Sequence, residues 1–165
     1  MHPTQHYSPE TYKARSSVGY LIKRAAALGI ECIEPAIEAR GFTFTQWVVL
    51  MYLRDGLAFN AKEICLQLRH DSGAVTRLID QLEAREFVRR ERSVDDRREV
   101  KLILTDAGRE MVELLIPTVV ERLNFMLRDF SAGEVSELTR LLHKFIGGFG
   151  AAGNTGDGAG TEGGE

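Results

Sequence analysis

The stretch that decides the fold of this chain is DSGAVTRLIDQLEA at residues 71–84, followed by FVRRER at 87–92 and EVKLIL at 99–104. Its first part carries four apolar residues at the spacing that gathers side chains on one face of an α-helix: Val75, Leu78, Ile79 and Leu82. The other two parts have the length and composition of β-strands joined by a charged turn. We therefore predict a helix with one buried face, followed by a β-hairpin.

The opposite side of this helix is predicted to face the solvent. At about 100° per residue it presents Gly73, Thr76 and Arg77 near the helix N-terminus, with Asp80 further along. Asp71, just before the helix, can accept hydrogen bonds from the free N–H groups of the first turn. Short polar groups and a single arginine at a helix N-terminus are suited to reading base edges and approaching phosphates.

A shorter helix is predicted immediately upstream. Asn60 and Glu63 have the spacing of a capping box. Four apolar residues then share one face: Ala61, Ile64, Cys65 and Leu68. Two short helices that meet at His70 and Asp71, with a hairpin behind them, indicate a winged helix-turn-helix over residues 60–105, a unit that reads DNA.

Residues 71–108 resemble the winged helix-turn-helix of the MarR family of bacterial transcription regulators. The resemblance rests on the run DSGAVTRLI and on five later residues: Asp96, Arg98, Leu104, Thr105 and Gly108. It extends over residues 10–148, because the flanking helices fall where that family places its dimerisation helices. Glu86 and Val94 depart from the pattern, since the family usually has a glycine and often a proline there, so the helix end and the wing tip can differ in shape.

The resemblance implies which residues contact DNA. It makes Arg98 the arginine that enters the minor groove, where the negative potential is enhanced, with Asp96 steadying a neighbouring positive group. The candidate DNA contacts are Ser72, Gly73, Thr76, Arg77, Asp96, Arg97 and Arg98. The expected partner is a pseudo-palindromic double-stranded operator, bound by a homodimer that acts as a repressor.

The fold class expected is mainly α, a winged helix-turn-helix with a two-stranded β-wing and long N- and C-terminal dimerisation helices. The tail from Gly147 holds nine of the sixteen glycines and no basic residue, a composition that cannot offset the entropy of ordering. The expected division is a mobile arm at 1–8, a domain at 9–149 with dimerisation helices in 9–56 and 106–149, and a disordered Gly-rich tail at 150–165.

Apolar spacing and caps predict the remaining helices. One long helix is expected from Pro9 to Arg40, kinked at Pro35 and ended by Gly41. Its narrow apolar seam consists of Val18, Leu21, Ala25, Leu28 and Cys32. Further helices are expected to open at Thr43 with Gln46, at Thr105, and at Ser131 with Glu134. Five residues of the outer helices are expected to bury themselves against a second copy: Leu21, Leu28, Leu138, Leu142 and Phe145.

Composition favours one domain with a sizeable core, because 44% of the 165 residues are apolar. No apolar run suggests a membrane span or a secretory signal, so a cytoplasmic location is expected. The net charge of −3 alone argues against binding nucleic acid, but residues 61–105 carry ten Lys and Arg against nine Asp and Glu. A basic cluster around the wing is therefore expected to bind phosphates: Arg85, Arg89, Arg90, Arg92, Arg97, Arg98 and Lys101.

The resemblance also implies an effector, because many members of the family release DNA on binding small aromatic carboxylates or phenols. Tyr20 and Arg24 share one face of the first long helix, and Trp47 opens the second. An arginine can hold a carboxylate by a bidentate bond while aromatic rings cover the apolar body of the ligand. The alternative is that Trp47 belongs to the core and Arg24 is a solvated surface charge.

Two function classes other than DNA binding by an effector-responsive repressor are compatible with the sequence. A winged-helix module that binds protein is one alternative, and a regulator that senses oxidants through Cys32 or Cys65 is another, although the position of each cysteine favours a structural role. No motif of an enzyme is present, no cofactor is implied, and no histidine pair has the spacing of a metal site.

Overall fold

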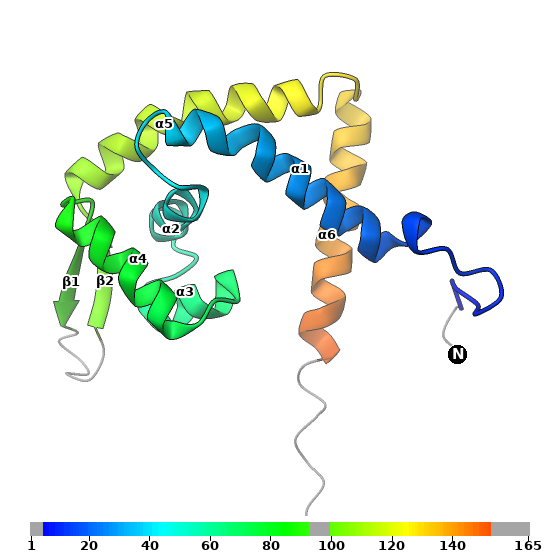
Figure 1. The fold of residues 1–165 in the computed structure, drawn as a ribbon, viewed down its shortest axis with the longest axis horizontal. Coiled ribbons are helices and arrows are strands. Elements are labelled where there is room, and N and C mark those ends of the chain that lie inside the picture. The colour runs from blue at the N-terminus through cyan, green and yellow to red at the C-terminus, as the bar shows by residue number, and fades with distance from the viewer. Residues whose placement is uncertain (1–4, 93–99, 153–165) are drawn as a thin grey trace, which may run out of the picture. The chain divides into compact units, whose positions relative to one another are not determined.

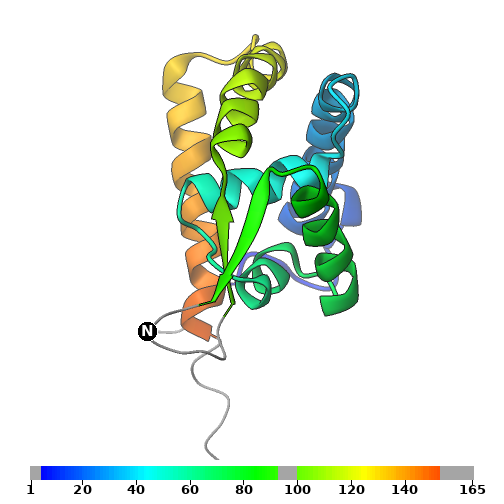
Figure 2. The same ribbon diagram turned by 90° about the vertical axis from the view of Figure 1, so that its left-hand side faces the viewer.

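The computed structural model describes residues 5–92 and 100–152, shown in Figures 1 and 2. The elements of this described part are η1 Ala14–Ser16, α1 Val18–Glu38, α2 Phe44–Arg54, α3 Ala61–Leu68, α4 Ser72–Ala84, β1 Val88–Arg92, β2 Val100–Leu104, α5 Asp106–Met126 and α6 Ala132–Ala152. The two strands form one antiparallel sheet. The predicted mainly α fold with a two-stranded wing is confirmed.

The chain forms two compact units, Met1–Met126 and Leu127–Glu165. In the first unit α2 lies among α1, α3, α4 and α5 (Figure 1), and its Val49 and Leu50 are completely buried. The core continues through the buried faces of α4 and α5, where Ile79 and Leu115 are almost inaccessible to solvent. One core therefore supports both the helix-turn-helix and the wing.

The prediction that the first long helix begins at Pro9 is wrong, and α1 is shorter than predicted at its N-terminal end. The helix begins at Val18, where the Ser17 side chain accepts a hydrogen bond from the N–H of Tyr20. Before it, the Tyr7 hydroxyl accepts a hydrogen bond from the N–H of Val18 at 3.0 Å. The apolar spacing also begins only at Val18, so residues 9–17 lack the apolar face that would stabilise a long helix.

The predicted seam of α1 is mostly exposed, with Leu21 at 52% and Leu28 at 50% of full exposure. The residues of α1 that enter the core are instead Ile33 and Ile37, near its C-terminal end. Pro35 lies between them within the helix, and Gly41 follows with φ +78°. Most of the length of α1 is therefore not covered by the first unit.

The predicted capping residues of α2 and α3 are confirmed. Thr43 and Gln46 form the expected reciprocal capping box at the start of α2. At α3 the Asn60 side chain accepts from the N–H of Glu63 at 2.9 Å, and the Glu63 carboxylate accepts from the N–H of Phe59. Each cap satisfies N–H groups that a helix start leaves without partners.

The wing is a hairpin whose register pairs Val88 with Leu104 at its base and Arg92 with Val100 at its far end. Figure 2 shows the two strands side by side. The backbone carbonyl of Phe59 also accepts a hydrogen bond from the N–H of Leu102 at 2.8 Å, which fastens β2 to the segment before α3. Val88 of β1 and Leu102 and Leu104 of β2 are buried and thus join the wing to the core.

The last two helices begin at the predicted caps. The Thr105 hydroxyl accepts from the N–H of Gly108 at 3.0 Å at the start of α5. Ser131 and Glu134 exchange hydrogen bonds at the start of α6. Apolar residues of α6 are exposed: Leu138, Leu141, Leu142, Phe145 and Ile146. None of the helices in the described ranges is long and apolar enough to cross a membrane.

Candidate DNA-binding site

The outward face of α4 carries the predicted contacts of the recognition helix. Ser72, Gly73, Thr76 and Arg77 are all exposed, whereas Val75 on the opposite face is completely buried. The Thr76 hydroxyl donates to the carbonyl of Ser72 at 2.7 Å, which holds its oxygen in place and leaves lone pairs free to accept. These placements agree with the predicted orientation of the helix, while contact with DNA stays a prediction.

Two local devices fix the N-terminus of α4. Arg69 ends α3 in the left-handed region with φ 52°, which reverses the chain between the two helices. Asp71 then accepts a hydrogen bond from the N–H of Ala74 at 2.8 Å. That bond lowers the pKa of Asp71, and the charge of Arg77 contributes in the same direction. The cap therefore stays ionised well into the acid range.

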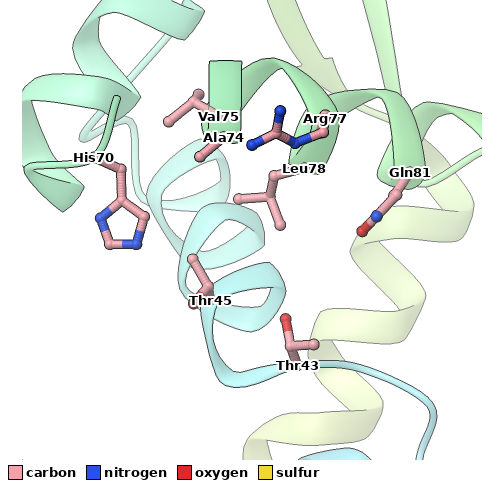
Figure 3. A pocket seen from close by; sticks show the side chains of 8 residues that line it. All are labelled: Thr43, Thr45, His70, Ala74, Val75, Arg77, Leu78 and Gln81. Atoms are coloured by element: carbon pink, nitrogen blue, oxygen red, sulfur yellow. The ribbon is translucent and has the colours of Figure 1, made fainter. Parts of the chain in front are cut away.

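A depression of about 340 Å³ borders the recognition helix (Figure 3). It is lined by Thr43, Thr45, His70, Ala74, Val75, Arg77, Leu78 and Gln81. Figure 3 shows the side chains of α4 facing the first turn of α2 across this space, with His70 at one side. Arg77 therefore borders a hollow in addition to lying on the exposed face.

The basic cluster expected around the wing is partly neutralised. Arg90 of β1 donates to Asp80 at 2.6 Å and forms a second ion pair with Glu83, both on α4. Burial opposes the charge of Arg90, yet the two carboxylates raise its pKa. Arg89 pairs with Glu91 along the same strand. Arg90 therefore joins the wing to the recognition helix with its charge largely compensated, and phosphate binding by the basic cluster stays a prediction.

Arg85, also assigned to that cluster, serves another contact. Its guanidinium lies 4.0 Å from the centre of the Phe42 ring and 4.9 Å from that of Phe87, and it donates to the carbonyl of Gly41 at 2.7 Å. Spacing along the sequence could not reveal partners 44 residues away. The only sequence feature that drew attention to Arg85 was the abundance of arginine in this part of the chain.

The departure at Glu86 leaves the turn intact. Glu86 adopts φ 60°, in the left-handed region that glycine enters without strain. The turn brings Phe87 back toward Phe42, and the two ring centres lie 5.2 Å apart. The chain thus makes a glycine-type turn with a glutamate, and the sharp end of α4 is preserved.

Asp96, Arg97 and Arg98 lie outside the described residues, as does Val94. The strands that precede and follow them are described, and both strands leave the core beside α4 (Figure 1). Lys101 of β2 is half-buried in this wing. The assignment of the wing-tip residues to DNA contacts stays a prediction.

The structure brings together two of the three predicted effector residues. Tyr20 and Arg24 line a depression of about 250 Å³ with Lys23 and Ala27, all on α1. Lys23 adds a second cation that the sequence pattern did not single out. Trp47 is not among the lining residues and is buried in the core at 6% exposure. Among the described residues, the lining of this depression therefore includes one aromatic ring and two positive groups.

The cysteines offer no redox pair of their own. Cys32 and Cys65 are both half-buried free thiols, on α1 and α3 respectively. Cys65 packs against the core, as expected for a small apolar residue. Within the described ranges no group of three or more His, Cys, Asp or Glu side chains could hold a metal ion.

Comparisons with known proteins agree with this geometry. The model of the MarR family matches residues 42–100, from the start of α2 into the wing. The HTH-type transcriptional regulator MgrA of Staphylococcus aureus is 35% identical over 107 residues, which cover 65% of this chain and 71% of that protein.

Solved structures of similar proteins extend the match to the outer helices. A structure of BpsR from Bordetella bronchiseptica, on the regulation of its DNA binding by 6-hydroxynicotinic acid, has a TM-score of 0.71 and 27% identity and covers 82% of this chain and 96% of that chain. A cysteine-to-serine mutant of MarR from E. coli, complexed with operator DNA, has a TM-score of 0.69 and 26% identity and covers 78% of this chain and 93% of that chain.

Proposed function

The chain belongs to the MarR family of winged helix-turn-helix transcription regulators, and we propose that it is a homodimeric repressor of a pseudo-palindromic operator. The observation that supports this most strongly is the exposed N-terminal face of α4, with Gly73, Thr76 and Arg77 beside an attached wing. A structurally similar protein has been solved with operator DNA on the same fold. Backbone contacts from the helix start would set the register, and side chains would read bases.

Exposed apolar side chains support the homodimer. On α1, Val18, Leu21 and Leu28 are 46–52% exposed, and on α6 five large apolar side chains are 38–65% exposed. Exposed apolar surface that forms stripes on long helices is typical of interfaces rather than of solvated helices. A second copy would place two recognition helices about 34–36 Å apart, one turn of DNA. Sedimentation at micromolar concentration tests this, and operator binding by a species that is only monomeric would contradict it.

Operator binding is tested with the intergenic DNA upstream of the chain's own coding sequence. Fluorescence anisotropy at fixed salt should show tighter binding to this DNA than to a scrambled duplex of the same composition. Arg98→Ala should weaken operator binding by a few kcal/mol at most while fold and assembly persist, because the proposed role of Arg98 is a single groove contact.

Arg140→Ala is the matched control, since Arg140 is an exposed arginine paired with Glu137 on α6. It removes the same charge far along the chain from the winged unit. Equal affinity for operator and scrambled DNA in the wild type would contradict the proposed function. Unchanged affinity in Arg98→Ala would contradict the role of the wing tip alone.

The proposed effector is a small aromatic carboxylate or phenol bound at the α1 depression. Its support is the placement of Tyr20 with Lys23 and Arg24, a ring next to two cations. The similar BpsR is described with an aromatic acid that regulates its DNA binding. Such a ligand can act only if it prefers the state that does not fit DNA.

A panel of benzoate, salicylate and cinnamate analogues should raise the melting temperature and lower operator affinity. Arg24→Ala should lose both responses, because a bidentate bond to the carboxylate is removed. Arg54→Ala, which alters an arginine paired with Asp55 on α2, is the control. Absence of both responses at millimolar ligand, or their persistence in Arg24→Ala, would exclude this site.

A further inference from the structure

The connector between α1 and α2, residues 41–43, is fastened to the C-terminal end of the recognition helix. Arg85 donates to the carbonyl of Gly41 at 2.7 Å and covers the rings of Phe42 and Phe87. Phe42 itself is 2% exposed and therefore firmly held in the core. The guanidinium thus bridges the connector, the core and the turn that ends α4.

A second link joins the same segments one turn earlier on α4. The Gln46 amide nitrogen donates to the Gln81 side-chain oxygen at 3.0 Å, and the Gln46 oxygen accepts from the N–H of Thr43 at 3.1 Å. Gln46 is 6% exposed, and both ends of its amide are hydrogen-bonded. The capping box of α2 therefore also holds α4.

We propose that Arg85 and Gln81 form a latch that sets the tilt of the recognition helix relative to α1, so that Arg85 is a positioning residue for operator recognition. This inference rests on the DNA binding proposed above. The latch holds one end of α4, while Gly73 and Thr76, the residues assigned to DNA, lie at the other end. Glu86 supports the latch, because its φ of 60° turns Phe87 back under the guanidinium.

Because α4 is long, a small tilt at its latched end displaces the residues that are proposed to contact DNA at its other end. The 13 residues of α4 span about 20 Å at 1.5 Å per residue. A tilt of about 5° at the latched end would move the far end by roughly 1.5 Å. Hydrogen bonds to base edges tolerate only about 0.5 Å in donor–acceptor distance, so such a tilt would abolish them. Phosphate attraction falls slowly with distance and would persist.

The planar guanidinium is required by this geometry. It lies against two rings while one of its N–H groups donates to a carbonyl, a combination that the ammonium of a lysine cannot reproduce. Arg85→Lys therefore keeps the charge but loses the latch. Arg85→Met keeps an apolar side chain over the rings but loses both the charge and the latch. These two variants separate position from charge.

Arg40→Met is the matched control. Arg40 is exposed next to the connector, and its side chain makes no hydrogen bond or ion pair within the described ranges. It removes the same charge at nearly the same place. Gln81→Leu breaks the second link at an exposed position and provides a latch variant that leaves Arg85 in place.

Each variant is measured for affinity to operator and to a scrambled duplex at several salt concentrations, after circular dichroism has shown native helix content. Arg85→Lys and Arg85→Met should both weaken operator binding about tenfold, the scale of one lost base contact. Gln81→Leu should weaken it in the same direction. Affinity for the scrambled duplex and its salt dependence should not change, and Arg40→Met should match the wild type.

Other results would overturn the latch. Wild-type affinity in Arg85→Lys would mean that only charge matters. Parallel loss on both duplexes, with a salt slope lower by about 0.9, would make Arg85 a phosphate contact. If Arg85→Met bound the operator with unchanged affinity, Arg85 would have no role in operator recognition. A wild type that does not distinguish the two duplexes would instead overturn the proposed function and the latch with it.

Discussion

Gly108→Ala is expected to be strongly destabilising, because α5 begins against the backbone of the wing. A Cβ at position 108 would lie 2.2 Å from the carbonyl oxygen of Phe87 and 2.8 Å from Cδ1 of Leu104, where ordinary contacts begin at 3.4 Å. The Leu104 methyl can rotate away, but the Phe87 carbonyl cannot easily move. It accepts a hydrogen bond from the backbone N–H of Thr105 at 3.1 Å, and the Thr105 hydroxyl donates to the neighbouring Glu86 carbonyl at 2.6 Å.

The magnitude follows from three terms. Forcing a methyl into a packed site costs about 1–3 kcal/mol. Displacing the Phe87 carbonyl weakens a hydrogen bond that contributes about 1 kcal/mol. Alanine returns about 1 kcal/mol through helix propensity. The expected net loss is about 1–3 kcal/mol, which for a chain of this size lowers the melting temperature by roughly 2–12 °C.

Thermal unfolding followed by circular dichroism, at one fixed chain concentration, measures this loss. Gly29→Ala is the matched control, because a Cβ there would meet only the methyl of Met126 at 3.7 Å, an ordinary contact. That substitution should leave the melting temperature unchanged or raise it by a few degrees. If Gly108→Ala melts at or above the wild-type temperature, the close approach of α5 to the wing does not determine the stability of this unit.

Three further predictions concern α4 and its ends. Glu86→Gly should stabilise the protein by up to about 1 kcal/mol in urea unfolding, because φ 60° strains a residue with a Cβ; destabilisation would show that the Glu86 side chain contributes contacts of its own. Ile79→Ala should cost about 2–5 kcal/mol, since Ile79 is 1% exposed, whereas Leu66→Ala, at a position 69% exposed, should cost little; equal losses would contradict the burial of this face. Asp71→Ala should lower the free energy of unfolding at neutral pH, as measured by urea unfolding at several pH values. The difference in unfolding free energy between wild type and variant should be complete above the ordinary aspartate pKa of about 4 and should shrink as the pH falls through the lowered pKa of the folded state. A difference that is independent of pH down to about pH 2 would argue against a charged cap.

The caps and the wing were predictable because each depends on residues close together in the chain. Thr43 with Gln46 and Ser131 with Glu134 satisfy N–H groups within one turn, whatever the rest of the protein does. Val100, Leu102 and Leu104 alternate along β2, which indicates one apolar face, and Leu102 and Leu104 are buried while Val100 is exposed. The N-terminal limit of α1 was predicted wrongly, because the helix begins only after the Ser17 cap.

Contacts between distant segments were not predictable. Arg85 and Arg90 look alike as members of a basic run, yet one stacks on Phe42 and the other pairs with Asp80 and Glu83. Trp47 was equally compatible with a pocket wall and with the core, and the packing of α2 decided for the core. The choice in each case depends on which side chains arrive from elsewhere in the chain.

The sequence by itself determined the order and type of the elements, the starts of α2 to α6 and the outward face of α4, because periodicity and capping act within a few residues. Only the tertiary structure decided that α1 enters the core through Ile33 and Ile37 while Leu21 and Leu28 remain exposed. Both pairs have helical spacing, so the pattern shows that α1 has apolar faces and not which one meets the core. The face that meets the core is the one that buries apolar area against α2 and α5. Because these helices are far from α1 in the chain, no local sequence pattern contains this information.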